Sequence, residues 1–314
     1  MELYTPVTAL PLPSLHYQDH LVCLGSCFAD RMGALFRRYA FQALVNTHGV
    51  LFNPISISKT IARAIVTPDT QVTSLRNQDG LWVSPEYHSV LAGLTEAEAQ
   101  QKIIAANRAL RDGILEAQWM VVTFGTAWVY VEKQTDRVVT NCHHFPAEEF
   151  SRKLLDVSQI AEEGKRLIDV LRILNPNLKL LFTVSPIRHL RDGMMDNSLS
   201  KATLLLAVQA IIQSVEDTYY FPSYEIMMDE LRDYRFYAAD LLQPNETALH
   251  YLWDRLAKSW FDKETMTMQK KIADYRLMQE HVAQNPLSES YVRFLEKKQA
   301  LGIEIEAELG RPLN

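Results

Sequence analysis

Cysteine is scarce in this sequence, and its cysteines suit no disulfide framework. The 314 residues contain only Cys23, Cys27 and Cys142. Their number is odd, and their spacing matches no pattern of paired bridges. The fold must therefore be held by an apolar core, and a reducing cytoplasm is the expected compartment.

Long apolar runs and an excess of positive charge are also lacking. No apolar stretch approaches the roughly 20 residues needed to cross a bilayer, and the start MELYTPVTALPLPSLHYQDH lacks the basic and apolar regions of a secretory signal. The formal net charge is −6, whereas a nucleic-acid-binding protein usually carries a basic face. We therefore expect a cytoplasmic protein with neither a membrane nor a nucleic acid as its partner.

What is present is an alternation of apolar segments with helical ones. Strands are expected at 20–25, 41–46, 118–124, 178–184 and 219–226, and helices at 27–39, 56–65, 95–114, 158–174 and 199–216. Strands that are apolar throughout and alternate with helices indicate an α/β fold with a parallel sheet covered on both faces. The last of these helices is apolar nearly all round, so we expect it to be buried on two sides.

The composition changes after Trp260. Residues 263–314 are charged and have a helical period, with a break at Asn285-Pro286. We expect a main domain over 1–262 and a C-terminal helical extension over 263–314. The extension would pack on the main domain or provide the interface of a homo-oligomer.

Small and hydroxyl residues follow the expected strands. Ser26 comes after the first strand, Gly49 after the second, Gly125 and Thr126 after the third and Ser185 after the fourth. Ligands of parallel sheets bind outside the carboxyl ends of the strands. The sequence therefore predicts a site at this edge.

Ser26 is the leading candidate for a nucleophile. At a helix N-terminus its oxygen would lie near backbone N–H groups and the positive end of the helix dipole, which favour a nearby anion. A serine in this place can equally be a structural N-cap, worth about 1 kcal/mol. Cys27 is a rival nucleophile, since helix N-termini lower the pKa of a thiol, but packing as a small apolar residue is favoured.

Cofactor and metal signatures are weak. Cys142-His143-His144 suggests a metal cluster, but neighbouring residues in an extended segment point to opposite faces, so the three cannot easily share one ion. No CxxC, HExxH, Walker or GxGxxG spacing occurs. We expect neither a metal nor a cofactor.

Gly25 to Ala29 read GSCFA, and this string names a family. FNPISI, TFGTAWVY, NCHHFP, TVSPIRHLRDG and YFPSYEIMMDELRDYRFY match it too, so the chain resembles the GSCFA family from Leu21 to Phe261. That family is grouped with the SGNH (GDSL-like) hydrolases. The resemblance implies a flavodoxin-like three-layer αβα sandwich.

The resemblance also implies roles for the residues at the sheet edge. Ser26 would be the nucleophile, with its own backbone N–H in the oxyanion hole, and Gly49 is similar to the SGNH glycine that donates a second amide. Gly125-Thr126-Ala127 falls where those enzymes carry Gly-x-Asn. Ala127 has no side-chain donor, so Thr126 or a backbone amide would have to replace the asparagine.

The general base departs from the family pattern. Relatives read Asp-x-x-His, whereas this sequence has Asp240 followed by Gln243. Glutamine cannot accept a proton near neutral pH. Asp240 would then orient or polarise, and the base would be His189 first, or else His88 or His143.

Two functions of different class follow from these residues. The first is a serine hydrolase that acts on a small-molecule ester or acyl group through Ser26. The alternative is a pseudo-hydrolase that binds an acyl or glycan ligand or a protein partner, and it is motivated by Gln243 and Ala127.

Overall fold

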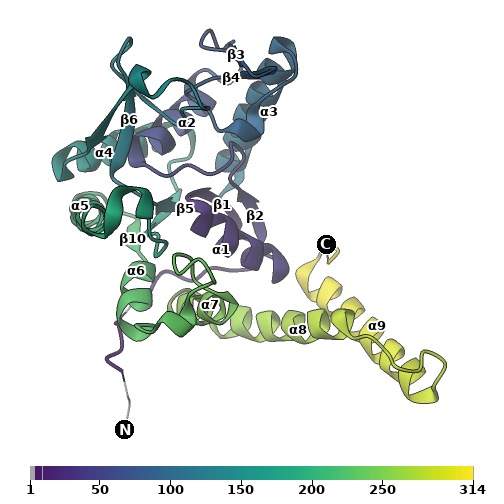
Figure 1. The fold of residues 1–314 in the computed structure, drawn as a ribbon. Helices are drawn as coiled ribbons and strands as arrows, with labels where there is room; N and C mark the ends of the chain where they lie inside the picture. The colour runs from purple at the N-terminus through teal and green to yellow at the C-terminus, as the bar shows by residue number, and fades with distance from the viewer. Residues whose placement is uncertain (1–3, 9, 314) are drawn as a thin grey trace.

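The computed structural model describes residues 4–8 and 10–313, and a five-stranded parallel sheet lies at its centre (Figure 1). Its strands are β1 (His20–Gly25), β2 (Gln42–Val45), β5 (Trp119–Phe124), β9 (Lys179–Val184) and β10 (Thr218–Tyr220). Across the sheet they follow the order β10-β9-β5-β1-β2. Counted along the chain this is 2-1-3-4-5, the flavodoxin-like order, so the predicted fold class is confirmed.

Helices cover both faces of this sheet, as period-two side-chain alternation requires. They are α1 (Cys27–Arg38), α2 (Pro54–Val66), α3 (Glu96–Glu116), α4 (Val157–Leu174), α5 (Gly193–Ser214), α6 (Ser223–Glu225), α7 (Glu246–Trp260), α8 (Lys263–Glu280) and α9 (Glu289–Leu309). In β1, Leu21 and Cys23 enter the core under α1 and α7. Val22 and Leu24 enter the opposite core, under α2 to α5. The result is a three-layer sandwich.

The helices α8 and α9 pack back on the layer that holds α1. Met268 and Ile272 of α8, with Ile305 and Leu309 of α9, are buried in the same core as the α1 side chains. Figure 1 shows the two helices running outward from α7 and turning back on themselves. The core beneath α1 is thus completed by the end of the chain.

Two small antiparallel sheets, which the sequence pattern did not predict, lie beyond the carboxyl edge of the main sheet. One pairs β3 (Arg76–Gln78) with β4 (Leu81–Val83), and the other has the order β7-β6-β8. The strands of the latter are β6 (Trp128–Glu132), β7 (Arg137–Val139) and β8 (Phe150–Leu154). In Figure 1 both sheets lie at the top of the molecule, away from α7 and α8.

Two expectations about the last third of the chain are wrong. The strand β10 ends at Tyr220, because the chain turns at Pro222 into short helical segments that run to Glu230. The helix α5 is buried on one face only and leaves Leu199 and Leu206 more than half exposed. Within residues 4–8 and 10–313, no helix is long and apolar enough to span a membrane.

Candidate active site

Ser26 lies where β1 passes into α1, beside the end of β5. Gly25 allows this close approach, since a Cβ at its φ of 141° would meet the Thr123 carbonyl oxygen at 2.1 Å. The Ser26 hydroxyl oxygen accepts a bond from the Phe28 amide at 3.3 Å, so the N-cap role is real. The Ser26 residue is 0% exposed. A substrate can reach it only if a covering group moves.

Three groups from three loops surround one face of Gly125. The point where a Cβ on Gly125 would stand is 3.1 Å from the Ser26 Cβ, 3.1 Å from the Phe52 carbonyl oxygen and 3.4 Å from His189 Nε2. The residues Ser26, Gly125 and His189 were predicted at one sheet edge, and the structure brings them together there. Phe52 was not predicted.

His189 carries an unsatisfied nitrogen at this point. Its Nε2 is buried and has no hydrogen-bond partner among the described residues, and its ring packs edge-on against Phe52 with centroids 5.6 Å apart. Burial of the imidazole, together with the charge of Lys201, lowers the pKa of His189 to about 4. The ring is therefore neutral at pH 7. An unpaired buried polar atom costs about 1–3 kcal/mol, so it calls for an explanation other than folding.

The amides of Gly125 and Thr126 converge on one oxygen. Both donate to the Phe52 carbonyl, at 2.8 and 3.0 Å. Two neighbouring N–H groups aimed at one carbonyl oxygen have the geometry of an oxyanion hole, and here a peptide of the chain itself fills it. The Thr126 hydroxyl lies 3.0 Å from the Ser200 hydroxyl, so its side chain is directed away from Ser26 towards α5.

The other two amides predicted for the oxyanion hole also have protein acceptors. The Ser26 amide donates to the Thr123 carbonyl at 3.2 Å, and the Gly49 amide donates to the Asn46 carbonyl at 2.8 Å. Asn46 was not predicted, yet its side chain accepts from the Gly25 amide at 2.9 Å and so fixes the start of α1 against β2. In this conformation none of the four expected donors points into open space.

The segment that replaces the usual Asp-x-x-His motif forms its own turn. The exposed Asp240 carboxylate accepts the amides of Leu242 and Gln243 at 2.9 and 3.1 Å. The Arg188 amide donates to the Leu242 carbonyl at 3.3 Å, so the turn lies beside the segment that carries His189. No hydrogen bond among the described residues joins Asp240 to a histidine.

The two alternative bases are engaged elsewhere. His88 packs on Gly49, and its Nδ1 accepts the Val90 amide at 3.1 Å. His143 is buried, and its Nε2 donates to the carbonyls of Ser84 and Tyr87 at 2.8 and 2.9 Å. Both are therefore held by the loops beyond the sheet.

The chain around Cys142 is not the extended segment that was predicted. His143 and His144 have φ values of 46° and 60°, in the left-handed region, because the chain reverses direction there. Within residues 4–8 and 10–313, no three His, Cys, Asp or Glu side chains are grouped so that they could hold a metal ion.

Lys201 of α5 was not predicted, and it joins two of the strand ends. The side chain is fully buried, and its Nζ donates to the carbonyls of Gly125 and Ser185 at 2.6 and 2.7 Å. These carbonyls follow β5 and β9, so Lys201 fixes the two loops that carry Gly125 and His189. Burial lowers the pKa of Lys201 to about 7. The available signal was a lone lysine in the apolar run LSKATLLLA.

Replacing Lys201 with methionine is expected to remove a pH dependence of stability. The lysine pKa is about 7 in the folded state, against 10.5 for an ordinary lysine. Between these values the unfolded chain binds more protons, so the free energy of unfolding rises with pH. Relative to Lys201→Met, the wild type should gain about 1 kcal/mol between about pH 7.5 and 8.5 in urea unfolding. The same slope in both proteins would contradict this assignment.

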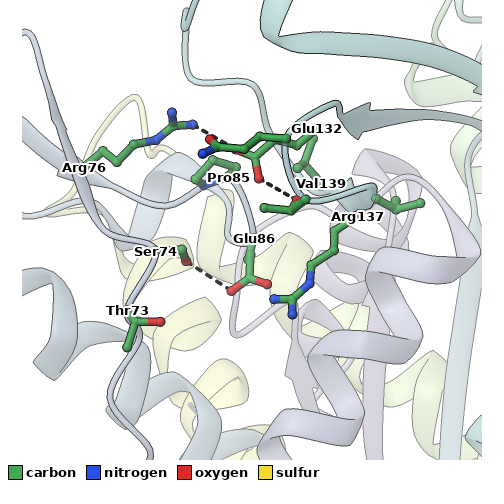
Figure 2. Close-up of a pocket in the computed structure, with 11 residues that line it drawn as sticks. Thr73, Ser74, Arg76, Pro85, Glu86, Glu132, Arg137 and Val139 are labelled. Atoms are coloured by element: carbon green, nitrogen blue, oxygen red, sulfur yellow. Dashed lines mark hydrogen bonds and ion pairs between the residues drawn. The ribbon is translucent and has the colours of Figure 1, made fainter.

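A hollow of about 210 Å³ near β3 and β7 contains none of the predicted site residues (Figure 2). Its charged side chains are paired. Arg76 is bound to Glu132 at 3.3 Å, and Glu86 accepts from Ser74 at 3.1 Å. Such satisfied pairs indicate a structural role, because little charge is left over to recognise a ligand.

The comparison with known families supports the location of the site. The model of the GSCFA family matches residues 20–256, which is well over half of the chain. The chain belongs to the GSCFA family. The match includes every candidate residue from Ser26 to Gln243 and leaves α8 and α9 outside. The chain matches none of the curated proteins with which it was compared.

Proposed function

We propose that this GSCFA protein is a serine hydrolase that cleaves an ester or acyl bond of a small molecule, with Ser26 as nucleophile and His189 as base. The observation that carries the proposal is the unpartnered, buried Nε2 of His189, which faces Ser26 across Gly125. The link to the SGNH hydrolases that the GSCFA motif implies supports it. The three cysteines are free, which fits the reducing cytoplasm that we propose as the compartment.

In the proposed reaction, the Ser26 hydroxyl gives its proton to His189 Nε2 and attacks the carbonyl carbon of the substrate. The amides of Gly125 and Thr126 stabilise the negative oxygen of the tetrahedral intermediate. His189 then returns the proton to the leaving alcohol, and water hydrolyses the acyl-serine by the same two steps. Asp240 has no part in this scheme, because its carboxylate closes its own turn.

Phe52 is the group that a substrate must displace. Its carbonyl holds the position at Gly125 and Thr126 that the substrate oxygen would take, and its ring packs on His189. When the substrate carbonyl replaces that of Phe52, the two amide hydrogen bonds are kept, so the exchange loses little hydrogen-bond energy.

A second function, a pseudo-hydrolase that binds an acyl or glycan ligand or a protein, is favoured by one set of observations. The Ser26 side chain is buried, and all four predicted oxyanion donors are satisfied by the chain itself. Gln243 stands where relatives carry the usual histidine. A protein of this kind would bind its ligand without turnover.

Labelling with a fluorophosphonate separates the two functions. The wild type should become labelled on the peptide that contains Ser26, as located by mass spectrometry, and Ser26→Ala should not be labelled. The matched control is Ser288→Ala, since Ser288 caps α9 through a similar bond of 3.2 Å to the Tyr291 amide. It should lose about 1 kcal/mol of stability and keep the label. No Ser26-dependent label in the wild type would refute the hydrolase and leave the binding protein.

A further inference from the structure

A hollow of about 430 Å³ adjoins the Ser26 site, and Phe52 and His88 form part of its lining. Phe52 joins the two because its carbonyl also binds the Gly125 and Thr126 amides. His88 joins them because it packs on Gly49. We call this space the basic hollow, and its argument-bearing residues are Phe52, His88, Tyr130, His144, Arg152 and Arg191. Its size is that of a small-molecule pocket.

The charge of the basic hollow is opposite in sign to that of the whole chain. Its described lining residues include two arginines and three histidines but no aspartate or glutamate, although the chain has a net charge of −6. The smaller hollow near β3 differs, since it contains Glu86 and Glu132 beside its arginines. Cationic groups gathered without carboxylates raise the local concentration of an anionic ligand.

Both arginines of the basic hollow are oriented by aromatic rings. The Arg152 guanidinium carbon lies 4.1 Å from the centre of the Trp128 ring, and that of Arg191 lies 5.2 Å from the centre of the Tyr130 ring. Stacking on a ring limits the directions in which a guanidinium presents its N–H groups. A planar, oriented guanidinium binds carboxylate or phosphate through two parallel hydrogen bonds.

We propose that the basic hollow is the subsite for an anionic group of the substrate, a carboxylate or a phosphate, which Arg191 and Arg152 bind while the scissile carbonyl takes the place of the Phe52 carbonyl. This inference rests on the proposed function, because it assigns the substrate class of the same site. The aromatic side chains of Phe52 and Tyr130 would contact the part of the substrate between the two ends. The substrate class is therefore an ester that carries a negative charge.

Binding is tested without turnover, on Ser26→Ala protein, with benzoate, phenyl phosphate and the neutral benzamide as probes followed by ligand-observed NMR. At least one anion should bind about tenfold or more tightly than benzamide, as a charge-assisted hydrogen bond requires. Adding Arg191→Gln should remove this preference. The comparison of benzoate with phenyl phosphate decides which anion the subsite prefers.

The matched control is Arg137→Gln, because Arg137 lines the smaller hollow instead. It should leave the preference for the anion unchanged. Arg191 is an exposed residue, so its replacement should leave the fold intact, and circular dichroism checks this. If Arg191→Gln alone unfolds the chain, Arg152→Gln is tested in the same way.

Hydrolysis of 4-acetoxybenzoate and of the neutral 4-acetoxybenzamide by the wild type separates the two proposals. An anion preference in binding without hydrolysis of either ester would support the subsite and refute the hydrolase. Hydrolysis without any anion preference would support the hydrolase and overturn the subsite. Equal binding of all three probes, or a preference that survives the arginine replacements, overturns the inference.

Discussion

Replacing His189 with glutamine is expected to lower kcat/KM for an aryl ester about a thousandfold, the usual contribution of a general base. Glutamine approximates the size of the imidazole but cannot take the Ser26 proton. The Nε2 atom of His189 makes no hydrogen bond among the described residues, so its loss breaks none there. The fold should therefore survive, and urea unfolding checks that it does.

The pH profile of the wild type gives an independent measure of the same base. His189 must be neutral to accept a proton, and its pKa is lowered from 6.5 to about 4. The value of kcat/KM should therefore persist at about pH 5 and fall only as the pH falls through about 4. An ordinary histidine base would lose activity through pH 6.5.

The control for this substitution is His250→Gln, which changes an exposed histidine on α7 and should leave kcat/KM unchanged. The assignment would be wrong if His189→Gln kept its activity. It would also be wrong if His88→Gln or His143→Gln gave the thousandfold loss instead, because the base would then lie in the loops beyond the sheet.

Replacing Gly125 with alanine is expected to lower kcat/KM about a hundredfold or more. The added methyl group would stand 3.1 Å from the Ser26 Cβ and 3.4 Å from His189 Nε2, so it pushes the nucleophile and the base apart. Displacements of about 1 Å can cost a hundredfold in rate. Overpacking should cost about 1–3 kcal/mol of stability at the same time.

Gly113→Ala is the matched control for Gly125→Ala. Its added methyl group would lie 2.4 Å from a terminal carbon of Leu44, between α3 and β2. It should therefore lower the urea midpoint by a similar amount and leave kcat/KM nearly unchanged. If the two variants lose activity in proportion to their loss of stability, Gly125 has only a packing role.

The sequence predicted the parts of the fold that have a strong period and missed those that are short and polar. The segment QWMVVTFG announced β5 because a strand covered on both faces is apolar throughout. The strands β3, β4 and β7 have only three residues each, which is too few to show alternation. The one-sided burial of α5 was missed because its outer face is also apolar, with Leu199 and Leu206 exposed.

The candidate site was predictable only as far as the strand ends are. The rule that ligands bind at the carboxyl edge placed Ser26, Gly125 and His189 together. Lys201 could not be found in this way, because lysine is almost always exposed unless it is paired, and its two carbonyl partners come from other elements. The Phe52 carbonyl is a backbone group, and no side-chain pattern reveals where a peptide points.

The residues on either side of Phe52 set how far that peptide can travel. Leu51 is buried and its amide is bound to the Gly25 carbonyl at 2.8 Å, while Asn53 caps α2 through the Ser56 amide at 2.8 Å. With both neighbours anchored, admission of a ligand amounts to the rotation of one peptide plane and one aromatic ring, without the swing of a long lid. Structures with and without ligand should then have nearly superimposable Cα traces, and the difference between them would be found in a single carbonyl direction.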